Sequence, residues 1–256
     1  MNVLDRFRLD GRVALVTGGA RGLGMAIAQA LASAGASVAL SARSLDSAES
    51  AAKVLADSTG RKTLGVSADV TRRDQVEAMV ARTCEVLGRL DILVNNAGIN
   101  IRGPIEELSE EDYDAVLDAN LKGPWLCCRA VAPILKAQRW GRVINVSSML
   151  AEVGIANRTP YASSKGGLTM LTKTLALEWA PFNVTVNAIC PGPFATEMNL
   201  ALIKDPVVNA TFTSKIPLGR WGDPAELGPA AVFLASEASS FMTGASLFVD
   251  GGYTAQ

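Results

Sequence analysis

The stretch Val13–Gly24, VALVTGGARGLG, runs from four apolar residues through a glycine-rich turn into an apolar helical pattern that continues to Ala34. A short apolar run predicts a buried strand, and apolar residues that recur every three to four positions over Leu23–Ala34 predict a helix. Gly35 follows, at the position where a glycine commonly ends a helix. The chain therefore begins with a strand, a tight glycine turn and a helix.

The same alternation of apolar runs and helical patterns continues along the chain. The further predicted strands are Val38–Ser41, Thr63–Ser67, Ile92–Val94, Val143–Val146, Val184–Ile189 and Leu247–Val249. The further predicted helices are Ala48–Ala56, Arg72–Leu87, Ser109–Lys136 and Tyr161–Ala180. Strands separated by helices pair in parallel through right-handed crossovers, which place helices on both faces of the sheet. The sequence therefore predicts an α/β fold, a single-domain, doubly wound, Rossmann-type sheet of seven parallel strands over residues 1–256.

The charges of the chain are balanced, with 24 lysines and arginines against 25 acidic residues. This leaves no basic field to hold a polyanion, so no nucleic-acid partner is expected. Met1–Leu9 alternates apolar and charged residues without a long hydrophobic run, so neither a signal peptide nor a membrane anchor is expected. These features favour a cytoplasmic protein with no membrane partner.

Histidine and cysteine usage restricts the chemistry. Histidine is absent, which excludes Ser-His-Asp hydrolases, Cys-His proteases and the common zinc sites. The cysteines have no CxxC spacing and are interpreted as reduced structural thiols: Cys84, Cys127, Cys128 and Cys190. We therefore expect no metal site, and a metal-dependent alcohol dehydrogenase is excluded for lack of ligands.

The glycines of the first turn are placed to bind a dinucleotide. Gly18, Gly22 and Gly24, with Leu23 between the last two, lie where the backbone could approach a pyrophosphate at the positive end of a helix. Their spacing differs from the GxGxxG pattern, and a tight turn without a ligand is the alternative interpretation. Their position after the first strand of a doubly wound sheet favours a cofactor site.

Two arginines indicate which dinucleotide binds. Just beyond the second predicted strand, where a carboxylate would bind the ribose hydroxyls of NAD, the sequence has Arg43. Its guanidinium could form a fork on a 2′-phosphate, and Arg21 in the glycine turn could supply a second charge. Each arginine alone could be a solvated surface charge. Together they predict NADP(H) as the cofactor.

Residues that follow the next two strands are also candidates for the cofactor site. Asp69 and Val70 follow the third predicted strand, and Asn96 and Gly98 follow the fourth. These positions lie at the sheet edge where ligands bind in such folds, so we expect them within reach of the adenosine. Asp69 could instead cap the helix that begins near Arg72.

Tyr161 and Lys165 form the predicted proton-transfer pair. Their separation places both side chains on one face of a helix, so that an ammonium can lie beside the phenol and lower its pKa from about 10. A core tyrosine with a surface lysine is the alternative for so short a pattern. Ser148 follows the fifth strand and could hold the substrate oxygen. Asn120 is a polar amide within a predicted helix, where it is expected to bind something.

At these residues the sequence resembles the short-chain dehydrogenase/reductase family. The resemblance extends from about Leu9 to Tyr253, and the matching segments are Thr17–Gly24, Asn95–Gly98, Asn120, Ser148, Tyr161 with Lys165, Pro191-Gly192 and Val249–Gly252. It implies that Tyr161 donates or accepts the proton, that Ser148 orients the reacting oxygen, and that Lys165 also binds the nicotinamide ribose. It further implies that Asn120 anchors a water linking Lys165 to solvent. Pro191, Gly192 and Thr196 would lie at the nicotinamide, and a homotetramer is implied.

The substrate is indicated by likeness within the family and by two arginines. Leu9–Arg12, Asn96–Asn100 and Ile216–Arg220 look most like gluconate 5-dehydrogenases, with 3-oxoacyl-carrier-protein reductases close behind. Arg102 could hold the carboxylate of a sugar acid, and Arg158 competes for that role; a solvated surface arginine is the alternative. The predicted reaction is hydride transfer between NADP(H) and a ketone or secondary alcohol, with 5-ketogluconate as a candidate. The alternatives are a 3-oxoacyl-carrier-protein reductase, a general carbonyl reductase and a non-enzymatic NADP(H)-binding regulator.

The stretch Pro191–Thr213 has no strong periodicity and is predicted as a loop that could act as a substrate lid. A poorly patterned helical insertion is the alternative interpretation.

Overall fold

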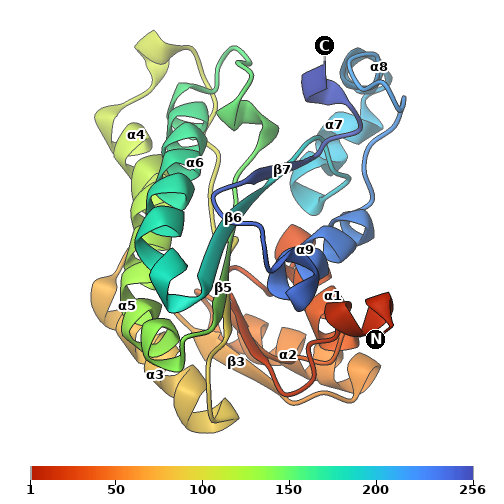
Figure 1. Cartoon of the computed structure of the whole chain (residues 1–256). Helices are drawn as coiled ribbons and strands as arrows, with labels where there is room; N and C mark the ends of the chain where they lie inside the picture. The colour runs from red at the N-terminus through yellow and green to blue at the C-terminus, as the bar shows by residue number, and fades with distance from the viewer. Residues whose placement is uncertain (1, 256) are drawn as a thin grey trace.

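A computed structural model describes residues 2–255 of the chain, apart from the side chains of Met198 and Ala201. Its centre is one parallel sheet (Figure 1). The sheet has seven strands in the order β3-β2-β1-β4-β5-β6-β7. The strands are β1 (Val13–Val16), β2 (Ser37–Ala42), β3 (Thr63–Ser67), β4 (Ile92–Asn95), β5 (Gly141–Val146), β6 (Val184–Pro191) and β7 (Ser246–Val249). The doubly wound, seven-stranded parallel sheet predicted from the sequence is confirmed.

The strand order reverses at β1, which pairs with β2 on one side and with β4 on the other. At such a reversal the connections on the two sides run to opposite faces, which leaves a crevice beyond the carboxyl ends of the strands. The glycine turn after β1 lies at this crevice.

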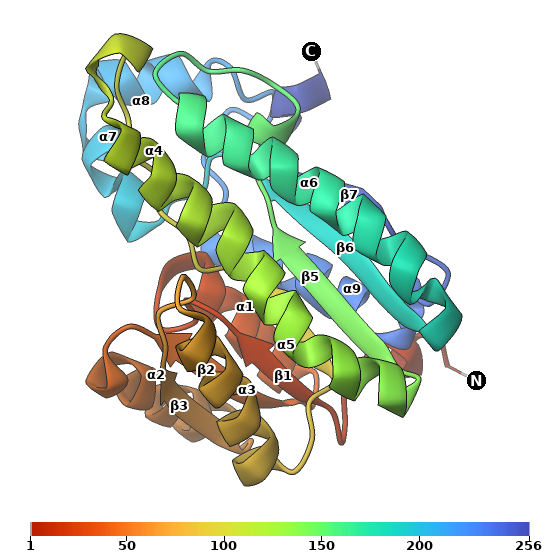
Figure 2. The same ribbon diagram turned by 90° about the vertical axis from the view of Figure 1, so that its left-hand side faces the viewer.

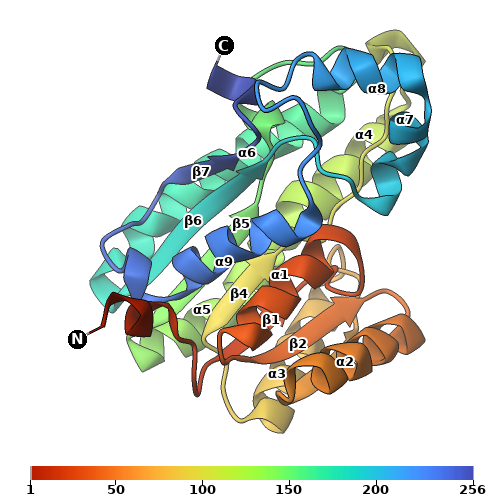
Figure 3. The ribbon, with the colours of Figure 1, turned by 90° about the vertical axis from the view of Figure 1, so that its right-hand side faces the viewer.

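Helices cover both faces of the sheet (Figures 2 and 3). They are α1 (Gly22–Ser33), α2 (Leu45–Thr59), α3 (Arg73–Leu87), α4 (Glu110–Leu117), α5 (Gly123–Gln138), α6 (Thr159–Trp179), α7 (Leu200–Lys204), α8 (Pro206–Thr213) and α9 (Gly228–Ala235). On one face, Leu31 of α1 and Leu234 of α9 belong to one buried apolar core. On the other face, Met79 of α3 and Leu135 of α5 belong to a second. Because both faces are covered, β1, β4, β5 and β6 are buried along their whole length.

The single helix predicted over Ser109–Lys136 is interrupted. A π-helical turn, Asp118–Lys122, joins α4 to α5. Such turns widen a helix locally and occur often at functional sites. Asn120 lies within this turn and is fully buried, so the interruption coincides with the amide that sequence analysis singled out.

The loop predicted over Pro191–Thr213 is wrong in its second half, where the helical alternative holds. A 3₁₀ turn, Glu197–Asn199, leads into α7 and α8. Asp205 caps α8 by accepting hydrogen bonds from the amides of Val207 and Val208, and Pro206 occupies its first position. The Asp-Pro pair was the local signal for this helix.

All four cysteines are free thiols, as the sequence predicted. Cys127, Cys128 and Cys190 are buried, and burial raises the pKa of Cys128 to about 12, as expected of a structural thiol. Within residues 2–255, no helix has the length and apolar character needed to cross a bilayer.

Candidate active site

The turn after β1 is shaped by its glycines. Gly18 and Gly22 have φ of 61° and 55°, a region that residues with a Cβ rarely adopt. A Cβ at Gly24 would collide with the carbonyl oxygen of Gly18 and with Nδ2 of Asn96. Arg21, at the N-cap of α1, makes no capping hydrogen bond through its side chain. The first amides of α1 therefore have no side-chain cap and can donate hydrogen bonds to an anion.

The glycine turn is held to the end of β4 by two side chains. The hydroxyl of Thr17 accepts hydrogen bonds from the amides of Asn96 and Ala97, at 3.0 and 3.1 Å. Nδ2 of Asn96 donates to the carbonyl oxygens of Thr17 and Gly18, both at 3.0 Å. The predicted cofactor residue Asn96 thus fixes the shape of the turn.

Arg21 and Arg43 are both exposed, and neither side chain has a hydrogen bond or ion pair to another described residue. Arg43 follows β2 directly. Ser44, the next residue, caps α2 by accepting a hydrogen bond from the amide of Ser47 at 3.4 Å. The end of β2 therefore presents a free guanidinium next to a helix N-terminus, and both attract anions.

The alternative role of Asp69 as a helix cap is wrong. The N-cap of α3 is Arg72, which makes no capping bond through its side chain. Oδ1 of Asp69 instead accepts from the amide and the hydroxyl of Thr71, at 2.9 and 2.8 Å. Val70 is buried, and a Cβ on Gly123 would lie 2.9 Å from its Cγ2. Both residues lie in the loop after β3, at the carboxyl edge of the sheet.

Asn120 connects the loop after β4 to α6. Its Oδ1 accepts from the amide of Ile99 at 2.8 Å, and its Nδ2 donates to the carbonyl of Ile99 at 2.9 Å and to the hydroxyl of Ser164 at 3.1 Å. Ser164 in turn donates to the carbonyl of Tyr161 at 2.7 Å. A Cβ on Gly98 would lie 2.8 Å from Oδ1 of Asn120. The amide thus fixes the loop after β4 relative to α6, a role that only their contact in space reveals.

Tyr161 and Lys165 lie together in the first turns of α6. Nζ of Lys165 is 5.5 Å from the centre of the Tyr161 ring and donates to the carbonyl of Val146 at 2.7 Å. The side chain of Lys165 is buried, which lowers its pKa to about 8, while the nearby Cys190 opposes the shift. Ser148 lies across from this pair, and its hydroxyl accepts from the amide of Leu150 at 3.1 Å.

The expectation that Lys165 lowers the pKa of Tyr161 is wrong for this structure. Burial raises the pKa of Tyr161, and a hydrogen bond with Ser148 and the charge of Arg102 oppose the shift. The desolvation of the phenolate outweighs both. Lys165 directs its ammonium at the Val146 carbonyl. Arg102, which sequence analysis placed only near the site, is thus the charge that acts on the tyrosine.

A buried hydrogen-bond chain beneath α6 was missed by sequence analysis. Nδ2 of Asn95 donates to Oδ1 of Asn145 at 2.8 Å, and Nδ2 of Asn145 donates to the hydroxyl of Thr172 at 2.8 Å. Ser147 donates to the backbone carbonyl of Lys165 at 3.1 Å. These bonds join β4 and β5 to the helix that carries the tyrosine and the lysine. An asparagine inside an apolar strand was the available signal.

Arg102 and Arg158 lie close together. The amide of Gly103 donates to the carbonyl of Asn157 at 3.3 Å, which joins their two loops. Burial and the charge of Arg102 lower the pKa of Arg158. Neither arginine forms an ion pair with a described residue, and Arg158 donates only to the carbonyl of Asn157. Two like charges left unpaired beside a tyrosine can attract an anion.

The three residues predicted at the nicotinamide lie on the segment that leaves β6. Pro191 ends the strand and pairs with Val249, and the amide of Gly192 donates to the Val249 carbonyl at 3.0 Å. A Cβ on Gly192 would lie 2.5 Å from Cα of Asp250. Thr196 is half-buried at the start of the following 3₁₀ turn, and its side chain makes no capping bond. No group of three acidic, cysteine or histidine side chains that could hold a metal occurs within residues 2–255.

A doubly wound sheet whose carboxyl edge gathers a glycine turn and a tyrosine–lysine pair defines a dinucleotide-dependent oxidoreductase. The family model described as Enoyl-(Acyl carrier protein) reductase matches residues 18–254. The chain belongs to this family, the short-chain dehydrogenases/reductases that the sequence indicated, and is an enzyme that acts on hydroxyl or keto groups.

Relatives of known activity match nearly the whole chain. The 5-keto-D-gluconate 5-reductase of Escherichia coli K12 is 40% identical, covering 97% of this chain and 97% of its own length. The 3-oxoacyl-[acyl-carrier-protein] reductase of Aquifex aeolicus is 38% identical, covering 96% of this chain and 98% of its own. A crystal structure of a gluconate 5-dehydrogenase from Burkholderia cenocepacia J2315 in complex with NADP and tartrate is 40% identical, with a TM-score of 0.96 and full coverage of both chains.

Proposed function

We propose that this protein uses NADP(H) to interconvert a ketone and a secondary alcohol on a small hydroxylated acid such as 5-ketogluconate. One observation carries the proposal: two arginines without ion-pair partners in residues 2–255, Arg102 and Arg158, lie beside an intact Tyr161–Lys165 pair. The tyrosine supplies the proton, and the arginines favour an anionic substrate. The relatives that act on gluconate and 5-ketogluconate support the same class.

The residues after β1 and β2 fit NADP(H). The absence of side chains at Gly18, Gly22 and Gly24 leaves backbone amides open to a pyrophosphate, with Leu23 in the same turn. Arg21 and Arg43 have no competing carboxylate and can bind a 2′-phosphate. The adenosine would be lined by Asp69, Val70, Asn96 and Gly98. In this proposal the whole chain acts as a single NADP(H)-binding domain.

The chain's own groups manage the proton and the orientation of the substrate. When bound, the nicotinamide supplies or accepts the hydride. In reduction, Tyr161 donates its phenolic proton to the oxygen of the carbonyl, and in oxidation its phenolate accepts that proton. Ser148 donates a hydrogen bond to the same oxygen. Lys165 would bind the ribose, and Asn120 would anchor the water that links Lys165 to solvent.

Pro191, Gly192 and Thr196 would form the nicotinamide side of the site. The hydroxyl of Thr196 makes no capping bond and is therefore able to contact the carboxamide. Arg102 and Arg158 would hold the carboxylate of the substrate between them, since two forks can bind both of its oxygens. The acyl chain of a 3-oxoacyl thioester and a neutral ketone both lack a carboxylate for this pair, which is why these alternatives rank lower.

A homotetramer is part of the proposal, and an apolar outer face on α5 and α6 supports it. Trp125, Met170 and Leu177 are 48%, 59% and 80% exposed. A groove beside them is lined by Leu117, Leu121 and Leu171, among others. Exposed apolar patches of this kind favour association with a second copy. Analytical ultracentrifugation should give four times the chain mass of 26.8 kDa. A cytoplasmic location remains a prediction that the four free thiols support.

The decisive experiment is a substrate panel. Oxidation of NADPH and of NADH would be followed with 5-ketogluconate, an acetoacetyl thioester and a cyclic ketone. We expect the highest kcat/KM with NADPH and 5-ketogluconate. A preference for the thioester or the cyclic ketone would favour the 3-oxoacyl reductase or the general carbonyl reductase. Tight NADPH binding without any turnover would favour the regulator.

A further inference from the structure

The segment 193–222 leaves the sheet after β6 and returns to a common base. The amide of Gly222 donates to the carbonyl of Pro193 at 2.9 Å, and the amide of Ala195 donates to the carbonyl of Gly222 at 2.8 Å. Phe194 is buried at this base, and a Cβ on Gly222 would lie 2.8 Å from its ring. This excursion, residues 193–222, contains α7 and α8, and its two ends are therefore joined to each other where it leaves and rejoins the sheet.

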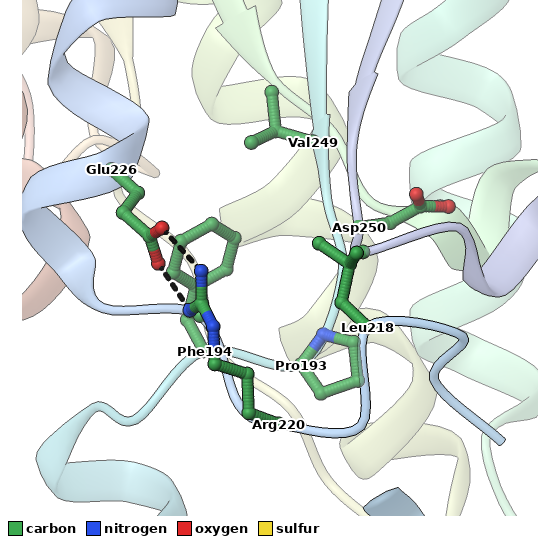
Figure 4. A pocket seen from close by; sticks show the side chains of 9 residues that line it. Pro193, Phe194, Leu218, Arg220, Glu226, Val249 and Asp250 are labelled. Atoms are coloured by element: carbon green, nitrogen blue, oxygen red, sulfur yellow. Dashed lines mark hydrogen bonds and ion pairs between the residues drawn. The ribbon is translucent and has the colours of Figure 1, made fainter. Parts of the chain in front are cut away.

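The returning limb of the excursion, residues 216–222, is held to the body of the protein by an ion pair and by backbone hydrogen bonds. Arg220 forms a two-pronged ion pair with Glu226, with both bonds at 2.7 Å (Figure 4). The amide of Leu218 donates to the carbonyl of Gly251 at 3.2 Å. A cavity of about 90 Å³ lies between this limb, Phe194 and the end of β7. The limb can therefore serve as a fixed support.

Helix α8 has little else to hold it in place. None of its described side chains is buried. One side-chain hydrogen bond joins it to a described residue beyond its own cap and ends, from Nε1 of Trp221 to Oδ1 of Asn209 at 2.7 Å. The Trp221 ring also lies 5.4 Å from the ring of Phe212, centre to centre. Elements with few buried contacts open locally at low cost, so this pair of contacts decides where α8 lies.

The position of α8 affects the candidate site because the excursion lies at the same edge of the sheet. Figures 1 and 3 show α7 and α8 beyond the carboxyl edge of the sheet, where the tyrosine end of α6 also lies. The same excursion carries Thr196 at its outgoing limb. Its movement would therefore change the walls of the site while leaving the proton-transfer groups on α6 in place.

We propose that Trp221 is a positioning residue that fixes α8 over the substrate side of the site through its hydrogen bond to Asn209. This rests on the proposed function for its kinetic consequence. Trp221 carries out no chemistry itself. It fastens a helix without buried residues to a limb that Arg220, Leu218 and Gly222 hold to the body of the protein.

The test is a double-mutant cycle of Trp221→Phe and Asn209→Leu. Trp221→Phe keeps an aromatic ring against Phe212 and removes the N–H donor together with part of the indole surface. Each single variant should raise the KM for 5-ketogluconate roughly three- to tenfold, as expected for loss of one hydrogen bond, with kcat within about twofold. The double variant should be no worse than the worse single variant. Ser58→Ala is the matched control, because it removes an exposed side-chain hydrogen bond of 3.1 Å between α2 and Gln29 of α1, and it should change neither KM nor kcat.

Hydrogen exchange of residues 206–213 provides a readout that does not depend on turnover. Exchange should be roughly three- to tenfold faster than in wild type in both single variants. In the double variant it should be no faster than in the faster of the two single variants. Unchanged exchange, or additive effects in the cycle, would overturn the proposed role. If wild type reduces no ketone while exchange responds as expected, the positioning role stands and the proposed function fails.

Discussion

Arginines cluster at both edges of the sheet, but one cluster is paired with carboxylates and the other is not. At the amino edge, Arg12 and Arg89 contact the buried carboxylate of Asp91 at 3.2 and 2.7 Å. Arg142, which is 1% exposed, pairs with Glu237 at 3.2 Å. Every guanidinium of this group therefore has an acidic partner.

An indole completes the amino-edge cluster. The guanidinium carbons of Arg12 and Arg142 lie 3.5 and 4.4 Å from the ring centre of Trp140. The indole N–H donates to Glu237 at 2.7 Å. Stacked and paired in this way, the charges join the starts of β1, β4 and β5 and leave nothing for a ligand to bind.

At the carboxyl edge four arginines are left without carboxylates. Within residues 2–255, no ion pair involves Arg21, Arg43, Arg102 or Arg158. Arg158 lies in the field of Arg102, and keeping these two like charges together without a carboxylate costs stability. The amino-edge charges therefore hold the fold, and the unpaired ones at the carboxyl edge fit the proposal that they bind anionic ligands.

The largest expected effect belongs to the carboxyl edge. Tyr161→Phe should lower kcat by about 10²–10⁴-fold, because it removes the transferable proton and little else. Binding of NADPH, followed by fluorescence titration, should stay nearly unchanged. A variant that keeps more than half of the wild-type rate would contradict the catalytic role of the tyrosine.

The amino edge should respond in stability and not in catalysis. Asp91→Ala removes the shared partner of Arg12 and Arg89 and an acceptor for the amide of Val13. We expect a loss of about 2–3 kcal/mol in the free energy of unfolding, measured with urea. The kcat/KM per folded molecule should stay at the wild-type value. A change in kcat/KM without a loss of stability would break the contrast between the edges.

Arg43→Ala tests whether the unpaired Arg43 binds the 2′-phosphate of NADPH. It should weaken NADPH about tenfold or more relative to NADH, since a charged fork on the 2′-phosphate is lost. Arg82→Ala is a suitable control, because Arg82 is exposed but paired with Glu85 at 2.8 Å. Equal losses for both dinucleotides would show that Arg43 acts elsewhere.

Arg102→Ala tests the same idea at the substrate. The KM for 5-ketogluconate should rise about five- to tenfold, while the KM for a neutral ketone should change little. Arg158→Ala should behave alike, and the double variant should show whether the two charges act together. Parallel losses on charged and neutral substrates would end the sugar-acid interpretation.

The smallest expected effect is the pH dependence that Lys165 confers on stability. Its pKa is lowered from 10.5 to about 8 in the folded protein, so the unfolded chain binds this proton more tightly. Below about pH 8 the lysine is charged in both states and the penalty is complete. As the pH rises above that value the folded protein loses the proton first and gains stability.

Comparison with Lys165→Met isolates this contribution, because the other titrating groups cancel. Between about pH 8 and pH 10, the free energy of unfolding of wild type should rise relative to the variant by about 1 kcal/mol or more. A difference that stays constant over this range would mean that the lysine titrates alike in both states.

Sequence analysis predicted well those features that depend on local pattern. The strands of the sheet, the turn around Gly18 and Gly24, and the helical spacing of Tyr161 and Lys165 all follow from periodicity over a few residues. It failed at Pro191–Thr213, where α7 and α8 have weak patterns because none of the described residues of α8 is buried. The alternative role of Asp69 as a helix cap was also wrong, because Arg72 occupies the N-cap of α3.

The sequence by itself thus determined the fold class and the family, and it placed Tyr161 and Lys165 on one face of a helix, since these depend on neighbours along the chain. Only the tertiary structure decided that Arg102 and Arg158 lie together, that Asn120 joins Ile99 to Ser164, and that burial raises the pKa of Tyr161. Each of these depends on segments far apart in sequence that meet when the sheet forms. Desolvation and charge interactions act through space, and no local pattern encodes them.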